Sequence, residues 1–173
     1  GRFISFFPNG RKMSDGFYIS DKPEGEWLYW NENGNIIEKS MWKDGKPNGV
    51  SFTYYDFGKI QSCANWEDGK MNGEWKFYDE NEHLTELTNY KNGLKDGIAL
   101  QFYPDSTIKT KAFFKEELPH GIYEEFYESG NLKSQVEYIE GKMEGDLVKF
   151  DSTGNISSIE NYVNGISNIE PEM

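Results

Sequence analysis

The sequence predicts an all-β fold, an elongated repeat of seven 24-residue β-hairpins that forms a twisted antiparallel meander sheet. Three observations predict this fold: glycines at a fixed interval, aromatic columns at the same interval, and turn signals between short strand-like segments. The glycines of the series are Gly1, Gly25, Gly49, Gly73, Gly97, Gly121 and Gly145. Each step is 24 residues, without insertion or deletion, which suits one hairpin and its connections.

Two columns of aromatic residues follow the glycines through every unit. The first column is Phe6, Trp30, Tyr54, Tyr78, Phe102, Phe126 and Phe150, and the second is Tyr18, Trp42, Trp66, Tyr90, Phe114, Tyr138 and Tyr162. A single-layer sheet has no second layer against which to bury a face, and large rings offset part of that deficit. We therefore expect each ring to pack on its counterparts 24 residues before and after it.

Two turn signals divide each unit into two strands. The first is a glycine that permits positive φ, such as Gly34, and it recurs in five units. Glu82 and Ser106 stand in that glycine position in the other two units, where we expect longer or less regular turns. The second signal is a pair of glycines four residues apart, such as Gly45 and Gly49, which predicts a tight reversal.

The segments between the turns are rich in aromatic and β-branched residues and show no helical period. Residues 26–31 and 36–43 are one predicted strand pair. Consecutive hairpins should pair with one another, because neighbours in sequence are usually neighbours in a sheet. The predicted repeats are 1–24, 25–48, 49–72, 73–96, 97–120, 121–144 and 145–168, and a C-terminal tail, 169–173, follows them.

The charge of the chain limits the partners that it can bind. Eighteen Lys and Arg against 30 Asp and Glu give a net charge of −12. Such a surface repels phosphate backbones and anionic headgroups, so we expect no binding of nucleic acid or of acidic membrane lipid. A basic protein or a neutral ligand is easier to accommodate. The alternative is that the charge only keeps the chain soluble.

The sequence contains no recognisable pattern for catalysis or for a cofactor. The two histidines, His83 and His120, fall in predicted turns and have no Ser or Cys at a known motif spacing. Cys63 is the one cysteine, which excludes an intramolecular disulfide and a cysteine metal cluster. No phosphate loop, dinucleotide fingerprint or zinc spacing occurs. We therefore predict a protein that is not an enzyme, with no catalytic residues, no metal and no cofactor.

Six further aromatic residues are the candidate partner-binding residues: Trp27, Tyr29, Trp75, Phe77, Tyr103 and Tyr127. Side chains alternate along a strand, so Trp27 and Tyr29 share a face opposite to the column of Trp30. Trp75 and Phe77 repeat that placement two units later. We expect these rings on the less buried face, where exposed rings suit a sugar, a peptide or a protein surface. The alternative is that they only cover the reverse face of a thin sheet.

Several segments resemble the MORN repeat. They are Gly25-Glu26-Trp27-Leu28-Tyr29-Trp30 followed by Asn33-Gly34-Asn35-Ile36, and residues 73–78 and 121–127. The segment Trp42-Lys43-Asp44-Gly45-Lys46-Pro47-Asn48-Gly49 is similar to the Tyr-x-x-Gly-Lys-x-x-Gly connector of the bacterial variant. The resemblance covers all seven units and implies stacked β-hairpins in a bacterial MORN-repeat-variant protein of the YwqK-type, antitoxin-like repeat family. It implies a scaffold or accessory module that binds proteins and sometimes lipids, and it brings no catalytic residues.

The sequence leaves three functions open. The first is a non-enzymatic repeat scaffold for protein–protein interaction on the bacterial surface. The others are a carbohydrate- or cell-wall-binding module and an antitoxin that captures a cognate toxin. The location is not established, with export to the cell surface favoured over the cytoplasm. Open strand edges at the two ends would also permit end-to-end self-association.

Overall fold

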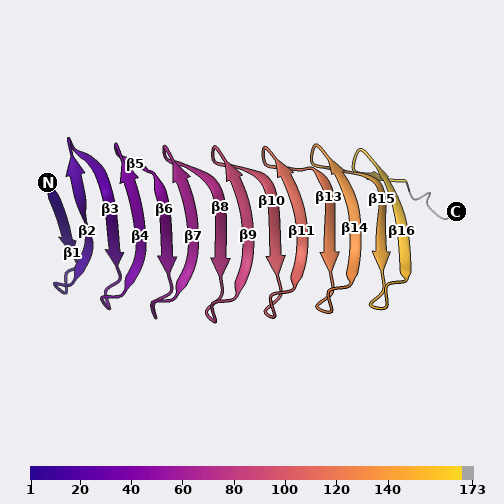
Figure 1. Ribbon diagram of the computed structural model, residues 1–173, viewed down its shortest axis with the longest axis horizontal. Coiled ribbons are helices and arrows are strands. Elements are labelled where there is room, and N and C mark those ends of the chain that lie inside the picture. Colours follow the sequence, from indigo (N-terminus) through magenta and orange to yellow (C-terminus); the bar gives the residue numbers. More distant parts are fainter. Residues whose placement is uncertain (169–173) are drawn as a thin grey trace. The chain divides into compact units, whose positions relative to one another are not determined.

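The computed structural model describes residues 1–168, and within them it contains 17 β-strands and no helix. The chain divides into two compact units. The N-terminal unit is residues 1–84 and 90–93, and the C-terminal unit is residues 85–89 and 94 onward. Figure 1 shows strands of alternating direction joined by short turns in each unit. No helix in the described part of the chain is long and apolar enough to cross a bilayer. The predicted tail, 169–173, lies outside the described residues.

The N-terminal unit is an antiparallel meander. Its strands are β1 (Arg2–Phe6), β2 (Lys12–Ile19), β3 (Lys22–Trp30), β4 (Ile36–Lys43), β5 (Lys46–Pro47), β6 (Gly49–Tyr54), β7 (Ile60–Glu67) and β8 (Lys70–Tyr78). Strands β1 to β4 pair in chain order, β4 pairs with both β5 and β6, and β6 to β8 continue the series. The predicted meander of hairpins is confirmed, because every pairing joins strands that are adjacent along the chain or separated only by the two-residue β5.

The C-terminal unit has the same arrangement. Strand β9 (Leu84–Lys91) contributes residues to both units. The remaining strands are β10 (Leu94–Phe102), β11 (Ile108–Lys115), β12 (Leu118–Pro119), β13 (Gly121–Phe126), β14 (Leu132–Ile139), β15 (Lys142–Phe150), β16 (Ile156–Val163) and β17 (Ile166–Ser167). From β10 onward they pair antiparallel in chain order, and β11 pairs with both β12 and β13. The two units therefore use one strand pattern, which the 24-residue interval predicts.

The repeat glycines Gly25, Gly73 and Gly145 lie in β-bulges rather than in turns. Gly25 has a φ of 72°, and the register of β2 and β3 shifts beside it. Glycine takes such a φ without a steric penalty, which explains the column. The reversals are made by two other residues, such as Asp44 and Gly45, whose φ values are 52° and 85°. The predicted reversal between Gly45 and Gly49 is therefore wrong in its extent, because Gly45 turns the chain and Gly49 begins β6.

The turns at the opposite ends of the strands share one hydrogen-bond pattern. In residues 31–35, the amide of Asn31 donates to the carbonyl of Asn35, and the amide of Gly34 donates to the carbonyl of Asn31. The turns that contain Glu82 and Ser106 repeat both bonds, and each of these residues has a φ of 71°. The expectation of longer turns there is wrong. Both residues adopt the left-handed backbone instead, at a cost of about 1 kcal/mol each.

In each unit, one row of residues crosses the strands and includes the most buried side chain of that unit, Trp27 or Val136; we call it the core row. It consists of Gly16, Trp27, Ser40, Ser51, Ala64 and Trp75 in the N-terminal unit, and of Ala99, Ala112, Tyr123, Val136 and Leu147 in the C-terminal unit. Trp27 and Val136 are each 3% exposed. In register, Trp27 is opposite Ser40 and Trp75 is opposite Ala64. Small residues beside large ones allow the rings to lie against the sheet at high packing density.

The ring contacts within each unit do not run along the aromatic columns. The ring of Tyr18 lies 5.6 Å from that of Phe3 and 5.0 Å from that of Trp27, centroid to centroid. In the C-terminal unit, Tyr138 lies 6.2 Å from Tyr123. Rings 24 residues apart stand on strands with another strand between them, roughly 9–10 Å away. The prediction that each ring packs on its counterparts is therefore wrong, and these contacts join Tyr18 and Tyr138 of the second column to other positions of the repeat.

Candidate interaction surface

Trp27 is the most buried of the six candidate residues. A Cβ atom at Gly16 would lie 2.2 Å from Cδ2 of Trp27, so the indole rests on the glycine backbone. The rings of Phe3 and Tyr29 lie 5.9 and 6.1 Å from it. Its Nε1 donor is buried and has no hydrogen-bond partner among the described residues. The expectation that Trp27 is exposed on the less buried face is wrong, because Gly16 gives the indole room to lie flat on the sheet and the residue is 3% exposed.

Tyr29, Trp75 and Phe77 are on the same face and remain partly exposed. Trp75 and Phe77 form a ring pair with centroids 5.8 Å apart. Tyr29 stacks on Trp27, and burial raises the pKa of the Tyr29 hydroxyl. The structure thus brings these four residues together as two pairs, one on β3 and one on β8. Their role in partner binding stays a prediction.

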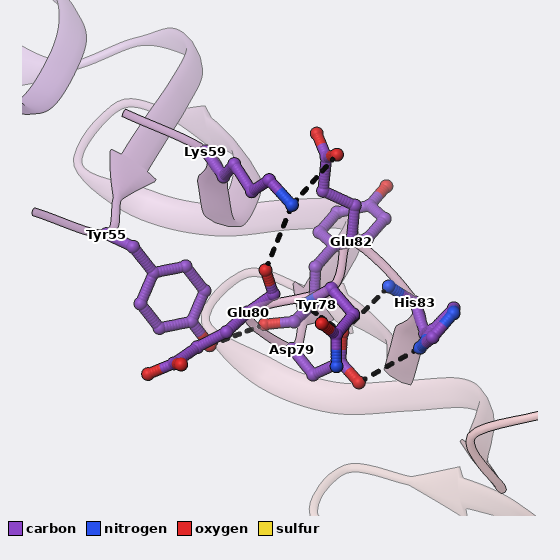
Figure 2. Close-up of polar contacts among 8 residues, drawn as sticks. Tyr55, Lys59, Tyr78, Asp79, Glu80, Glu82 and His83 are labelled. Carbon is purple, nitrogen blue, oxygen red and sulfur yellow. Dashed lines mark hydrogen bonds and ion pairs between the residues drawn. The ribbon is translucent and has the colours of Figure 1, made fainter. Parts of the chain in front are cut away.

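Tyr103 and Tyr127 lie in turns and bond to the repeat that follows. Their hydroxyls donate to backbone carbonyls 23 residues further along the chain, at 2.9 and 2.8 Å. In the N-terminal unit, Tyr55 makes the equivalent bond to the carbonyl of Tyr78 at 2.7 Å, as Figure 2 shows. These hydroxyls fasten one repeat to the next. Sequence reasoning missed this role, although the three tyrosines occupy one position of the repeat.

A polar cluster ties the turn after β8, residues 79–83, to the turn between β6 and β7, residues 55–59 (Figure 2). One carboxylate oxygen of Asp79 accepts from the amide of His83 at 2.9 Å, and the other lies 3.1 Å from Nδ1 of the same residue. The hydrogen bond from the backbone amide of His83 is the main reason that the pKa of the Asp79 carboxyl lies below its usual value. Lys59 donates to the carbonyl of Glu80 at 3.2 Å and lies 3.4 Å from the carboxylate of Glu82. The cluster therefore holds two turns together.

No metal centre emerges from this cluster or from the other acidic residues. Within residues 1–168, no three His, Cys, Asp or Glu side chains gather in a way that could hold a metal ion. His83 is engaged by Asp79, as described above, and Cys63 is a free thiol of intermediate exposure. The chemistry that the surface offers is therefore that of aromatic rings, carboxylates and backbone groups.

An apolar cavity lies beside the core row of the C-terminal unit. Its volume is about 120 Å³, and its walls include Ala112, Phe114, Pro119, His120, Tyr123 and Tyr138. Burial raises the pKa of the Tyr123 hydroxyl. Ala112 and Tyr123 hold the places that Gly16 and Trp27 hold in the N-terminal unit. We attribute the cavity to this difference, because tyrosine is smaller than tryptophan and the Cβ of alanine keeps the ring off the backbone. Sequence reasoning missed it.

The two units also differ in charge. The N-terminal unit has 14 carboxylates and 11 basic side chains, which give a net charge of −3. Residues 85–89 and 94–168 have 14 carboxylates and 7 basic side chains, which give −7. A positively charged partner is therefore attracted most strongly to the C-terminal unit.

A family model described as MORN repeat variant matches six segments of the chain. They are residues 23–44, 47–68, 71–92, 95–116, 119–140 and 143–164. The matches begin at intervals of 24 residues and together span more than half of the chain. No curated protein matches. The resemblance noted in the sequence is confirmed for the repeat class, and the division into seven units from residue 1 stays a prediction.

Proposed function

The chain belongs to the MORN repeat variant family, and from that premise we propose that it is a non-enzymatic scaffold that binds another protein through the faces of its hairpins. MORN repeats suggest a scaffold for protein or membrane interaction, and the family is generally non-enzymatic. The choice of a protein partner, and of a bacterial surface as its location, is the specific part of the proposal.

A constant frame with variable side chains is the observation that carries the proposal. Bulge glycines and turn hydrogen bonds recur from repeat to repeat. One position of the core row, by contrast, changes from Trp27 to Ser51, Trp75, Ala99 and Tyr123. Repeat proteins use such extended surfaces for recognition. The frame sets the spacing of the repeats, and the variable side chains that stay partly exposed, such as Trp75 and Tyr123, offer a different contact in each repeat.

The net charge of −12 favours a basic protein over an anionic membrane. An antitoxin that captures one toxin would be a narrower form of the same function. Sugar binding is a weaker alternative, because Trp27 is 3% exposed and its ring cannot stack on a sugar. Trp75 is half-buried and keeps that alternative open.

Affinity capture from an extract of the encoding organism, followed by native mass spectrometry, tests the proposal. We expect a protein complex of fixed stoichiometry that free chain displaces and that added salt weakens. The same chain is offered vesicles with and without phosphatidylglycerol, and a glycan array. Retention by anionic vesicles alone would contradict the proposal. Glycan binding that Trp75→Ala abolishes would contradict it in favour of the sugar-binding alternative.

A further inference from the structure

The place beside Ala112 differs from the corresponding place in the N-terminal unit. There, the indole of Trp27 covers Gly16 so closely that no Cβ fits between them. The space beside Ala112 stays open, with a volume of about 120 Å³ and an almost wholly apolar lining. An apolar cavity of comparable size holds a benzene ring. This cavity therefore has room for one phenyl or isobutyl group.

A second cavity adjoins the first and shares His120 with it. Its volume is about 360 Å³, and its walls are Lys115, Glu116, Leu118, His120 and Glu140. Neither Glu116 nor Glu140 forms an ion pair in the part of the chain that the structure describes. Two such carboxylates at one cavity outweigh the single lysine and favour a cation.

His120 stands where other repeats carry a side chain that accepts a hydrogen bond from the backbone of the next turn on this side of the sheet. Glu24 and Glu144 each accept a hydrogen bond from a backbone amide 20 residues further on, at 2.8 Å. His120 has the same place in its repeat, and its ring makes no hydrogen bond within the described residues. The hydrogen bond to the next turn is thus missing where the two cavities meet, and the imidazole of His120 is available to a ligand.

We propose that the two cavities form a docking site for a basic segment of a partner protein. One apolar side chain of that segment enters the cavity beside Ala112, and a neighbouring Lys or Arg approaches Glu116 and Glu140. This inference rests on the proposed function, since it names the partner chemistry of a protein scaffold. The charge of −7 over residues 85–89 and 94–168 adds long-range attraction for such a segment.

The lysines near the site determine where in it the cationic side chain of the partner segment binds. Nζ of Lys95 lies 5.4 Å from the ring centroid of Phe114, which lines the apolar cavity. Lys115 lines the second cavity beside the two carboxylates. A cationic side chain is therefore repelled from the Phe114 side. It is expected next to Glu140, with the apolar group directed toward Tyr123.

An NMR titration of the isotope-labelled full chain with three peptides, followed by its chemical shifts, tests the site. The peptides are acetyl-Lys-Lys-Phe-Lys-Lys-amide, the same peptide with Ser in place of Phe, and the Phe peptide with Glu in place of each Lys. Burial of a phenyl group predicts a dissociation constant about tenfold lower for the Phe peptide than for the Ser peptide. The largest changes in chemical shift should be those of Ala112, Tyr123 and Glu140 and their neighbours. The peptide with Glu in place of Lys should bind about tenfold more weakly than the Ser peptide.

Leucine substitutions at two native alanines, Ala112 and Ala99, supply a variant and its matched control. Ala112→Leu fills the cavity and should reduce the preference for Phe over Ser to about onefold, with the charge-driven binding of both Lys peptides retained. Ala99 is the register partner of Ala112 and does not line the cavity, so Ala99→Leu should keep the preference. Glu116→Gln with Glu140→Gln should weaken both Lys peptides several-fold.

Equal affinity for the Phe and Ser peptides would overturn the docking site, and so would an unchanged preference in Ala112→Leu. The docking site and the proposed function fail separately. If Ala112→Leu binds the captured partner as tightly as the unchanged chain does, the docking site fails and the scaffold function stands. If the unchanged chain captures no protein at all, the function itself fails.

Discussion

The two units of the chain share a frame and differ in what fills it. All five tryptophans belong to the N-terminal unit, where Trp27 lies flat on Gly16. The C-terminal unit has no tryptophan, and the corresponding pair, Ala112 and Tyr123, leaves an open cavity. Bulges and turns are alike in both. The comparison teaches that this frame depends on backbone geometry at a few positions, so the side chains of the core row are free to vary.

The largest expected effect is at the closest contact of the N-terminal unit. Gly16→Ala places a Cβ 2.2 Å from Trp27, so we expect the free energy of unfolding to fall by about 3 kcal/mol in urea denaturation. At the corresponding residue beside the open cavity, Ala112→Val should cost less than about 1 kcal/mol. In a Trp27→Leu background, Gly16→Ala should also cost less than about 1 kcal/mol. Equal costs in both backgrounds would show that the indole is not the obstacle.

The hydroxyl bonds between repeats should matter equally in the two units. Tyr55→Phe and Tyr127→Phe each remove a donor to a backbone carbonyl and should each lower the free energy of unfolding by about 1 kcal/mol. Tyr18→Phe is the control, since the Tyr18 hydroxyl has no hydrogen bond within residues 1–168. A loss for the control as large as for the other two variants would refute the fastening role.

The two turns in which Glu82 and Ser106 stand at the position of Gly34 should gain stability when glycine is placed there. Ser106→Gly should raise the free energy of unfolding by about 0.5–1 kcal/mol, because glycine adopts positive φ without strain. Glu82→Gly should gain less, since it also removes the exposed carboxylate that lies 3.4 Å from Lys59. Gly34→Ala, at the same place in another turn, should lose stability. Thermal denaturation ranks the three variants, and a loss in Ser106→Gly would contradict the account of the turn.

The smallest expected effect is a loss of stability in acid in both units. Hydrogen bonds from the side chains of Thr107 and Thr153 are the main causes that lower the pKa of Asp105 and of Asp151, as the His83 amide does for Asp79. The unfolded chain then binds these protons more tightly than the folded chain does. The stabilisation is therefore present above the usual Asp pKa of about 3.9 and is lost as the pH falls below it.

Urea midpoints measured between about pH 5 and pH 2 check the sign of this dependence. Asp151→Asn should lessen the fall in the midpoint, because one of the carboxylates that favour the folded chain is gone. Asp21→Asn serves as a comparison at an exposed turn residue. A midpoint that rises on acidification would contradict the prediction.

The hairpin repeat could be predicted because its markers lie at fixed positions of the sequence. Gly25 marks a bulge and Trp30 the end of a strand, and their equivalents recur at the same interval. The constant interval also implied a constant turn, so the expectation of longer turns at Glu82 and Ser106 gave too much weight to one missing glycine. Each 24-residue step contains two strands, and that spacing already excluded contact between rings of one column.

The candidate surface was harder to predict, because its contacts depend on residues in different repeats. Whether Trp27 is buried depends on Gly16 on the neighbouring strand, and the cavity depends on Ala112 and Tyr123 together. The hydroxyl of Tyr103 bonds to a backbone carbonyl, and such an acceptor has no signature in the sequence. Register, rather than composition, decides these contacts.

The bonds between successive repeats have a consequence for biosynthesis. In each unit they join residues about one repeat apart, as from Arg11 to Glu32 and from Tyr127 to Phe150. During translation, the hydrogen-bonding partners of a repeat therefore emerge from the ribosomal exit tunnel within about the next 24 residues. Short separations of this kind favour rapid folding, and assembly can follow the order of translation.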